Sequence, residues 1–251
     1  PGVSIIDVRD AWEFEGIGHL PGAVNIPFDS FRSEDSGEAG MLPGADVFAD
    51  VLSTAGVPDN NHIVAYDDTH GVFAARLLIT AELYGHPRDR LHLLEGDFSA
   101  WQREGAVSRE TPAYEQTNYQ ATYDATGPLV DLEMVETAIS DPNTTIIDTR
   151  ESREYEEGHI PGAVRLDWLE LVDQDSRGLR PEAEIQSLLT SRGITPETRI
   201  LLYCNTARRI SHTYVVLRYL GFDNLAFYEG SLTEWEAQGE KLETGDKDMS
   251  L

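Results

Sequence analysis

Short apolar runs alternate with amphipathic stretches along the whole chain. Runs of strand type lie at residues 5–6, 63–66, 91–94, 146–147, 200–203 and 225–228. Between these runs, apolar residues recur at helical spacing, as in Val47, Phe48, Val51 and Leu52 and again in Val215, Val216, Tyr219 and Leu220. The alternation of strand and helix predicts an α/β fold, with mostly parallel sheets flanked by helices.

The pattern occurs twice, which indicates two domains. Ile-Ile-Asp-x-Arg at 5–9 returns at 146–150, Gly-His-x-Pro-Gly-Ala-Val at 18–24 returns at 158–164, and Glu-Gly-x-x-x-x-Trp at 95–101 returns at 229–235. A solenoid has a repeat of only about 20 to 50 residues, so this long period means two copies of a whole domain. We expect a first domain over 1–110, a polar linker over 111–127 and a second domain over 128–251.

The two copies differ at their start. A segment that is predicted to be helical, Leu129–Ser140, precedes the second copy, whereas nothing precedes the first copy before Pro1. We therefore expect the natural protein to begin earlier, where a targeting signal would also lie.

The charge is strongly acidic and excludes several kinds of partner. The 251 residues include 45 acidic and 19 basic ones, for a net charge of -26, and the lysines are Lys241 and Lys247 alone. Nucleic acids and anionic membranes bind basic surfaces, so neither is expected as a partner. An acidic surface with almost no lysine is typical of proteins from salt-accumulating halophiles. We interpret the charge as an adaptation to high salt, with an ordinary acidic cytoplasmic protein as the alternative.

Two further features of the composition concern the compartment. No apolar run approaches the roughly 18 residues of a membrane span. The single cysteine excludes an internal disulfide and fits a reducing compartment such as the cytoplasm. No cluster of residues has metal-ligand spacing and no glycine-rich loop is typical of a nucleotide site, so we expect neither a metal nor another cofactor.

That single cysteine, Cys204, stands where a reactive side chain is expected. It ends the apolar run 200–203, and a helical pattern begins with Ser211. Ligands of parallel sheets bind beyond the carboxyl ends of the strands. The 25 residues from Thr198 to Phe222 contain four arginines and no acidic residue, and a nearby cation or helix N-terminus favours the nucleophilic thiolate. The alternative is that Cys204 is a small buried hydrophobe.

The duplicated motifs, in this order, resemble the tandem-domain rhodanese family of thiosulfate and 3-mercaptopyruvate sulfurtransferases over nearly the whole chain. The resemblance implies two rhodanese-like domains, of which the first is an inactive partner and the second carries the active cysteine. Asp67 stands in the first copy where Cys204 stands in the second, and an aspartate cannot carry a sulfane sulfur. We expect a Cys204 persulfide that passes sulfur from a small anionic donor, thiosulfate or 3-mercaptopyruvate, to cyanide, a thiol or a protein.

The resemblance also implies the residues that bind substrate. They form the loop after the cysteine: Asn205, Thr206, Ala207, Arg208 and Arg209. Arg209 and the loop amides would hold the leaving anion and the persulfide, whereas Arg208 either contacts substrate or is solvated at the rim. Asn205 and Ala207 depart from familiar versions of this loop, and Ala costs more than Gly if its φ must be positive.

Residues outside the loop receive weaker assignments. Phe73 and Trp168 correspond to positions that line the active-site pocket in the family, with core packing as the alternative. The pair Asp148 and Arg150 and the repeated histidines His19 and His159 are expected to be structural, as is Asp7 with Arg9, because the copy without a cysteine has them too.

Two other functions remain as alternatives. A non-catalytic sulfur carrier or interaction module would keep the fold, and the departures at Asn205 and Ala207 keep this possibility open. Related dual-specificity phosphatases need an arginine at the sixth position after the cysteine, where this chain has Ile210, with Arg209 one position earlier. The loop length therefore favours sulfur transfer.

Overall fold

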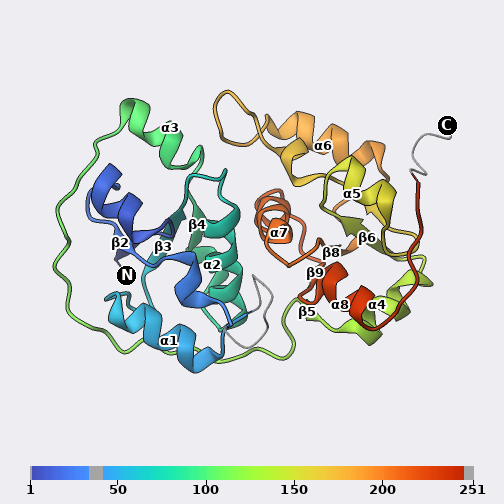
Figure 1. Cartoon of the computed structure of the whole chain (residues 1–251), viewed down its shortest axis with the longest axis horizontal. Helices are drawn as coiled ribbons and strands as arrows, with labels where there is room; N and C mark the ends of the chain where they lie inside the picture. Colours follow the sequence, from blue (N-terminus) through green and yellow to red (C-terminus); the bar gives the residue numbers. More distant parts are fainter. Residues whose placement is uncertain (1, 34–41, 246–251) are drawn as a thin grey trace. The chain divides into compact units, whose positions relative to one another are not determined.

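The computed structural model describes residues 2–33 and 42–245, which form two α/β units (Figure 1). The first unit consists of residues 1–125 and 173–179, and the second of residues 126–172 and 180–251. Each unit contains one parallel sheet with helices packed on it. The two sheets confirm the α/β fold that the alternating pattern predicts.

The sheet of the first unit has the strand order β2-β1-β3-β4, and all its pairings are parallel. Its strands are β1 (Val3–Asp7), β2 (Val24–Asn25), β3 (His62–Tyr66) and β4 (Leu91–Leu93). Its helices are α1 (Ala45–Thr54), α2 (Val72–Leu83) and α3 (Asp97–Glu104), with short helical turns η1 (Glu13–Ile17), η2 (Phe28–Phe31) and η3 (Arg88–Arg90). Helix α2 packs against β3 and β4 and is buried along almost its whole length.

The sheet of the second unit has the order β5-β9-β8-β6-β7 and is also parallel. Its strands are β5 (Leu129–Val130), β6 (Thr144–Asp148), β7 (Val164–Arg165), β8 (Arg199–Tyr203) and β9 (Leu225–Tyr228). Its helices are α4 (Leu132–Ile139), α5 (Ser152–Glu157), α6 (Glu182–Ser191), α7 (Arg209–Tyr219) and α8 (Ser231–Ala237), with the turn η4 (Trp168–Leu171).

Two element boundaries differ from the sequence-based expectation. The segment that was expected to be one helix over 129–140 begins as the short strand β5, and α4 starts only at Leu132. The reason is local: Asp131 is the N-cap, and its carboxylate accepts the backbone N–H of Met134. Helix α7 begins at Arg209, two residues before Ser211.

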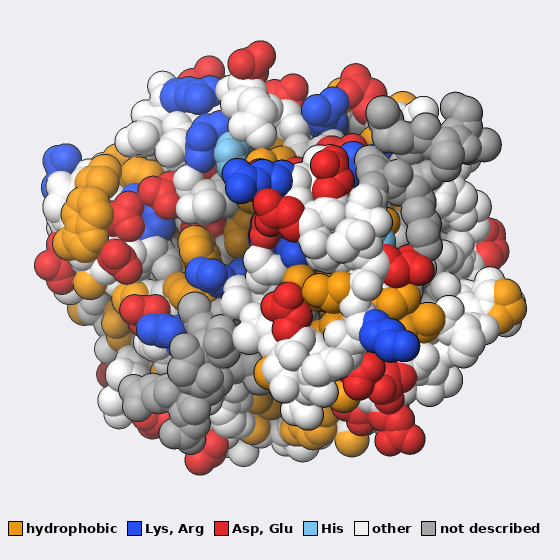
Figure 2. All heavy atoms as spheres, turned by 45° about the vertical axis from the view of Figure 1, so that its right-hand side comes forward, with side chains coloured by type: hydrophobic (Ala, Val, Ile, Leu, Met, Phe, Trp, Pro, Cys, Tyr) orange, Lys and Arg blue, Asp and Glu red, His pale blue; other side chains and the backbone are white. Residues whose placement is uncertain are grey.

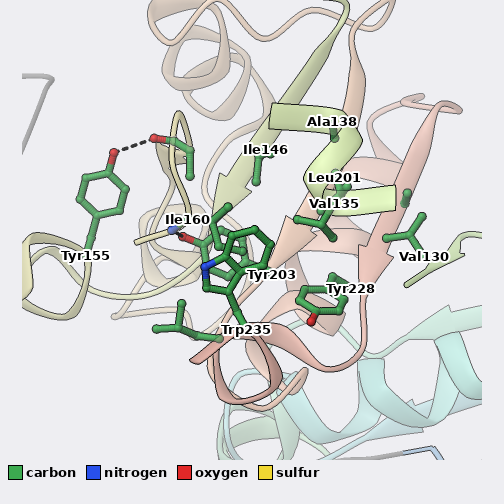
Figure 3. Packing of buried hydrophobic residues seen from close by; sticks show 13 residues of the cluster. Val130, Val135, Ala138, Ile146, Tyr155, Ile160, Leu201, Tyr203, Tyr228 and Trp235 are labelled. Carbon is green, nitrogen blue, oxygen red and sulfur yellow. Dashed lines mark hydrogen bonds between the residues drawn. The ribbon is translucent and has the colours of Figure 1, made fainter. Parts of the chain in front are cut away.

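A hydrophobic cluster of the second unit packs around strands β6, β8 and β9 (Figure 3). Its large side chains include Tyr203, Tyr228 and Trp235. The Trp235 indole N–H finds a partner at the cluster's edge, since it donates to the carbonyl of Lys241 at 3.0 Å. Burial of the α8 ring Trp235 fixes this helix beside the end of β8, where Cys204 follows.

A buried ion pair lies at the carboxyl end of β6. The Arg150 guanidinium donates to both carboxylate oxygens of Asp148 at 2.6–3.0 Å, as expected from the repeated motif. The Tyr203 hydroxyl donates to Asp148 at 2.7 Å and accepts the backbone N–H of Ile160 at 3.0 Å. The network therefore joins the ends of β6 and β8 to the repeated Gly-His-x-Pro-Gly-Ala segment.

The first unit repeats this arrangement. Arg9 donates to the carboxylate of Asp7, and the Tyr66 hydroxyl accepts the N–H of Leu20 at 3.1 Å. The repeated histidines have matching structural contacts: the His159 ring stacks on Tyr155 at 3.8 Å between ring centroids, and His19 stacks in the same way on Phe14 at 3.7 Å.

Residues 173–179 pack within the first unit, although they lie inside the second repeat of the sequence. Arg177 forms an ion pair of 2.7 Å with Asp97, whose side chain is buried, and donates to the carbonyl of Asp68 at 2.7 Å. Arg103 donates to the carbonyl of Asp175 at 3.0 Å. The repeated motifs alone do not predict that residues 173–179 of the second repeat pack in the first unit.

The surface agrees with the acidic composition. Acidic side chains are spread across the face drawn in Figure 2 rather than gathered in one patch. None of the helices in the described part of the chain has both the length and the apolar character needed to cross a membrane.

Tyr203→Phe is expected to lower the free energy of unfolding by about 1–3 kcal/mol, because it leaves the buried N–H of Ile160 without its acceptor and takes a donor from Asp148. Urea unfolding followed by circular dichroism measures this. Tyr219→Phe is the control, since Tyr219 is 74% exposed and its loss should change nothing. Equal unfolding midpoints for the two variants would contradict the role given to the Tyr203 hydroxyl.

Candidate functional site

The site is built where β8 ends and α7 begins. Cys204 directly follows Tyr203, the last residue of β8, and its side chain is buried with 1% exposure. The residues after it form a short loop to Arg209, the first residue of α7. A helix begins here with N–H groups that lack intrahelical partners, so an anion is stabilised at this end.

Helix α8 holds the first two loop residues by their backbone. The carbonyl of Cys204 accepts the N–H of Leu232 at 3.0 Å, and the carbonyl of Asn205 accepts the Thr233 hydroxyl at 2.8 Å. The N–H of Cys204 donates to the Ser231 hydroxyl oxygen at 3.3 Å. The conformation of the loop is thus fixed from outside, before any substrate binds.

The loop contains a residue in the left-handed region. Ala207 has a φ of 55°, which costs an alanine about 1 kcal/mol relative to glycine. Position 207 therefore needs a positive φ, the case in which alanine costs more than glycine. His70, at the matching position of the first unit, has a φ of 54°, but the next residue there, Gly71, is also left-handed with a φ of 87°, whereas Arg208 in the second unit is right-handed with a φ of -84°.

The first unit shows what its copy of the loop binds. Asp67 is 1% exposed, and its carboxylate accepts the backbone N–H groups of Thr69, Gly71, Phe73 and Ala74 at 2.7–3.1 Å. A carboxylate at the end of β3 thus fills a set of inward-pointing N–H groups. The corresponding positions in the second unit belong to Thr206, Arg208, Ile210 and Ser211.

Arg209 is paired with an acidic residue. Its guanidinium donates two hydrogen bonds to the carboxylate of Glu154 on α5, at 2.5 and 2.8 Å. Burial acts to lower the pKa of Arg209, but the hydrogen bond to Glu154 and the electrostatic interaction with Cys204 outweigh it and raise the pKa. The same hydrogen bond lowers the pKa of Glu154 below its ordinary value.

Asn205 connects this pair to the buried ion pair under the loop. Its amide nitrogen donates to Glu154 at 2.8 Å, and its carbonyl oxygen accepts a hydrogen bond from Arg150 at 3.3 Å. Arg208 instead donates to the hydroxyl of Thr206 at 3.2 Å. All five predicted loop residues therefore lie together around Cys204, but the two arginines have different partners.

The two predicted pocket residues lie in different units. Trp168 begins the turn η4, which packs against α7, and its ring lies 5.3 Å from the ring of buried His212. Phe73 belongs to α2 of the first unit, where its ring lies 4.7 Å from that of Phe28. Their role as a pocket wall stays a prediction.

Sequence reasoning missed Glu154, Ser231 and Thr233. Glu154 repeats Glu13 at the same distance from the Asp-x-Arg motif, which was a usable signal. Ser231 and Thr233 lie within the repeated Glu-Gly-x-x-x-x-Trp motif, but nothing in the sequence says that they hold the cysteine loop. Among the described residues, no group of three or more His, Cys, Asp or Glu side chains could hold a metal ion.

Comparisons with known proteins identify the family of both repeats. The family model described as rhodanese-like domain matches residues 1–104 and 131–238. A thiosulfate sulfurtransferase of Corynebacterium glutamicum is 30% identical over 94% of this chain and 82% of its own length. A sulfur carrier protein of Thermus thermophilus is 27% identical over 94% and 88%. The solved 3-mercaptopyruvate sulfurtransferase of Escherichia coli has 26% identity and a TM-score of 0.81, over 92% and 93% of the chains.

Asp67→Asn is expected to destabilise the first unit by at least about 2 kcal/mol, because an amide nitrogen cannot accept from the N–H groups that face the lost oxygen. The free energy of unfolding in urea measures the effect. Asp68→Asn removes the same charge one residue later and is the matched control. A loss of stability in the control as large as that in Asp67→Asn would show that charge, not the hydrogen bonds of Asp67, is responsible.

Proposed function

We propose that this chain, which belongs to the rhodanese family, is a sulfurtransferase whose active site lies in the second unit. The observation that supports this most strongly is the position of Cys204. It is a buried cysteine at a strand end, with four residues between it and a helix, in a loop whose copy in the first unit already binds a carboxylate. Relatives named thiosulfate and 3-mercaptopyruvate sulfurtransferase span nearly the whole chain.

In the proposed first step, the Cys204 thiolate attacks the outer sulfur of thiosulfate. The new bond joins Cys204 Sγ to that sulfur, and the sulfur–sulfur bond of thiosulfate breaks so that sulfite leaves with its electron pair. With 3-mercaptopyruvate the carbon–sulfur bond breaks instead, the thiol proton goes to the departing carbon, and pyruvate leaves. Both routes give the same persulfide anion on Cys204, which is a covalent intermediate.

In the second step, the outer sulfur passes to a thiophilic acceptor. Cyanide attacks that sulfur, the bond to Cys204 Sγ breaks, and thiocyanate leaves while the thiolate is restored. A thiol or a protein thiolate reacts in the same way and becomes a persulfide. The N–H groups at the start of α7 stabilise the negative charge of the intermediate, since such groups and the helix dipole both favour an anion.

The first unit is the non-catalytic partner in this proposal. For the sequence we propose a non-catalytic domain over 1–110, a linker over 111–127 and the catalytic domain over 128–251. Asp67 replaces the cysteine, and Val72 replaces the arginine that Arg209 supplies in the second unit. Without a nucleophile and with its loop amides already bound to Asp67, the first unit has no means to take up sulfur.

The environment of the protein is also part of the proposal. The net charge of -26 with two lysines supports a halophilic source. The single cysteine supports a reducing compartment such as the cytoplasm, where the thiolate is not consumed by disulfide formation.

A sulfur carrier without efficient turnover is the second candidate. The relative named sulfur carrier protein favours it, since it matches this chain over the same extent as the enzymes do. A carrier would still form the Cys204 persulfide but would pass it to a protein and not turn over with cyanide. The phosphatase reading has less support, because the arginine that ends this short loop is held by Glu154.

Exposure to thiosulfate in molar salt is expected to add one sulfur, roughly 32 Da, to the intact protein through a Cys204 persulfide. Mass spectrometry of the intact chain measures the gain, and a parallel sample with 3-mercaptopyruvate identifies the preferred donor. Later addition of cyanide should remove the added mass and release thiocyanate.

Cys204→Ser is the control and should gain nothing from either donor. A wild-type protein that gains no sulfur would rule out the enzyme reading. Loading by a donor without thiocyanate release would favour the carrier.

A further inference from the structure

Two adjacent arginines follow Cys204, but only one has its charge balanced. Arg209 donates two parallel hydrogen bonds to Glu154, with side chains only about a quarter exposed. A bidentate arginine–carboxylate pair fixes both side chains and compensates both charges. Glu154 therefore reduces the attraction of Arg209 for an arriving anion, although Arg209 still interacts electrostatically with Cys204.

Glu154 is also committed to the loop by a further donor. The side-chain amide of Asn205 donates to it, while the carbonyl oxygen of the same amide accepts from Arg150. Arg150 is itself held by the buried Asp148 at the carboxyl end of β6. A continuous chain of hydrogen bonds therefore runs from Asp148 through Asn205 and Glu154 to Arg209. Moving Arg209 toward a substrate would break this chain at its best-formed link.

The first unit shows what happens at this place without the neutral amide. Asp68 replaces Asn205 and faces Glu13, the counterpart of Glu154. Burial and the adjacent charge of Asp68 raise the pKa of Glu13, whereas Glu154 keeps its charge beside Asn205 and Arg209. The pairing of Glu154 with Arg209 is thus a particular feature of the unit that carries the cysteine.

Arg208 differs from its neighbour. Its side chain is half-buried at the start of α7, and its hydrogen bond is to the neutral hydroxyl of Thr206. Within residues 2–33 and 42–245, no acidic side chain forms an ion pair with it. Arg208 therefore carries the uncompensated positive charge of the loop.

We propose that the two arginines have separate tasks: Arg208 attracts and binds the anionic sulfur donor, while Arg209, locked by Glu154, positions the cysteine loop. This assignment rests on the proposed sulfur transfer. Arg208 is then the residue that sets donor affinity, and Arg209 and Glu154 are positioning residues that act on the rate. The two arginines are distinguished by their partners, since Arg209 forms an ion pair with Glu154 and Arg208 bonds to the neutral hydroxyl of Thr206.

Binding without reaction tests the proposal directly. Cys204→Ser cannot form a persulfide, so calorimetry with thiosulfate measures the dissociation constant alone. Adding Arg208→Gln to this protein is expected to raise the constant at least about tenfold, as for the loss of a charged hydrogen bond, and to weaken its dependence on salt. Arg208→Lys should recover most of the affinity, which separates charge from packing.

Glu154→Gln/Arg209→Gln is the matched variant, because it removes both charges and leaves the net charge unchanged. In the Cys204→Ser protein its dissociation constant for thiosulfate should stay within about twofold. With Cys204 present, the same pair of changes should lower kcat for thiocyanate formation much more than it alters KM. The conservative Arg209→Lys, which cannot form the bidentate pair, should share the loss in kcat.

The outcomes test the division of tasks between Arg208 and Arg209 separately from the proposed sulfur transfer. An unchanged dissociation constant in Arg208→Gln, or a tenfold rise in the Glu154→Gln/Arg209→Gln protein, would overturn the division of tasks, as would a Cys204→Ser protein that binds no thiosulfate. Sulfur loading of the wild type, measured by mass, decides the proposed function independently. Circular dichroism and urea midpoints confirm that each variant is folded, and Arg209→Lys, which keeps a positive charge beside Glu154, replaces the double variant if that one does not fold.

Discussion

The buried pair of Asp148 and Arg150 is the interaction on which the site depends. Removing two charges from water is costly unless each is paired and hydrogen-bonded, and here the partners of the pair come from several elements. Arg150 also donates to the carbonyl of Gly158 at 2.6 Å, and Asp148 receives the hydroxyl of Tyr203. The cost of burial is thus offset only when the ends of β6 and β8 and the segment after α5 are all in place, so the point at which Cys204 leaves the sheet is fixed as well.

The two units have corresponding loops that begin with different residues, Asp67 in the first unit and Cys204 in the second. In the first unit the group that accepts hydrogen bonds from the loop N–H groups is part of the protein, namely the carboxylate of Asp67. In the second unit the proposed anion is the sulfur of Cys204, first as the thiolate and then as the persulfide. Both loops place a residue other than glycine at a positive φ, His70 and Ala207, but they differ at the next residue, since Gly71 is left-handed and Arg208 is right-handed.

Much of this was accessible from sequence, for physical reasons that also explain what was not. Repeated motifs and apolar periodicity predict parallel sheets and place Cys204 at a strand end, because both depend on local patterns. The contact between Glu154 and Arg209 spans 55 positions along the chain and depends on how α5 faces the loop, which no local pattern encodes. The start of α4 at Leu132 was missed because the capping role of Asp131 competes with helical spacing over 129–140.

The segment 173–179 has a consequence for the modularity of the chain. It belongs to the second repeat of the sequence but packs in the first unit, where Arg177 is the cation beside buried Asp97. A first repeat transplanted alone would keep Asp97 and lose its counter-ion, a defect of roughly 3–5 kcal/mol when a buried pair is broken. The two repeats are therefore not interchangeable modules, because the first unit needs residues 173–179 of the second repeat to pair Asp97.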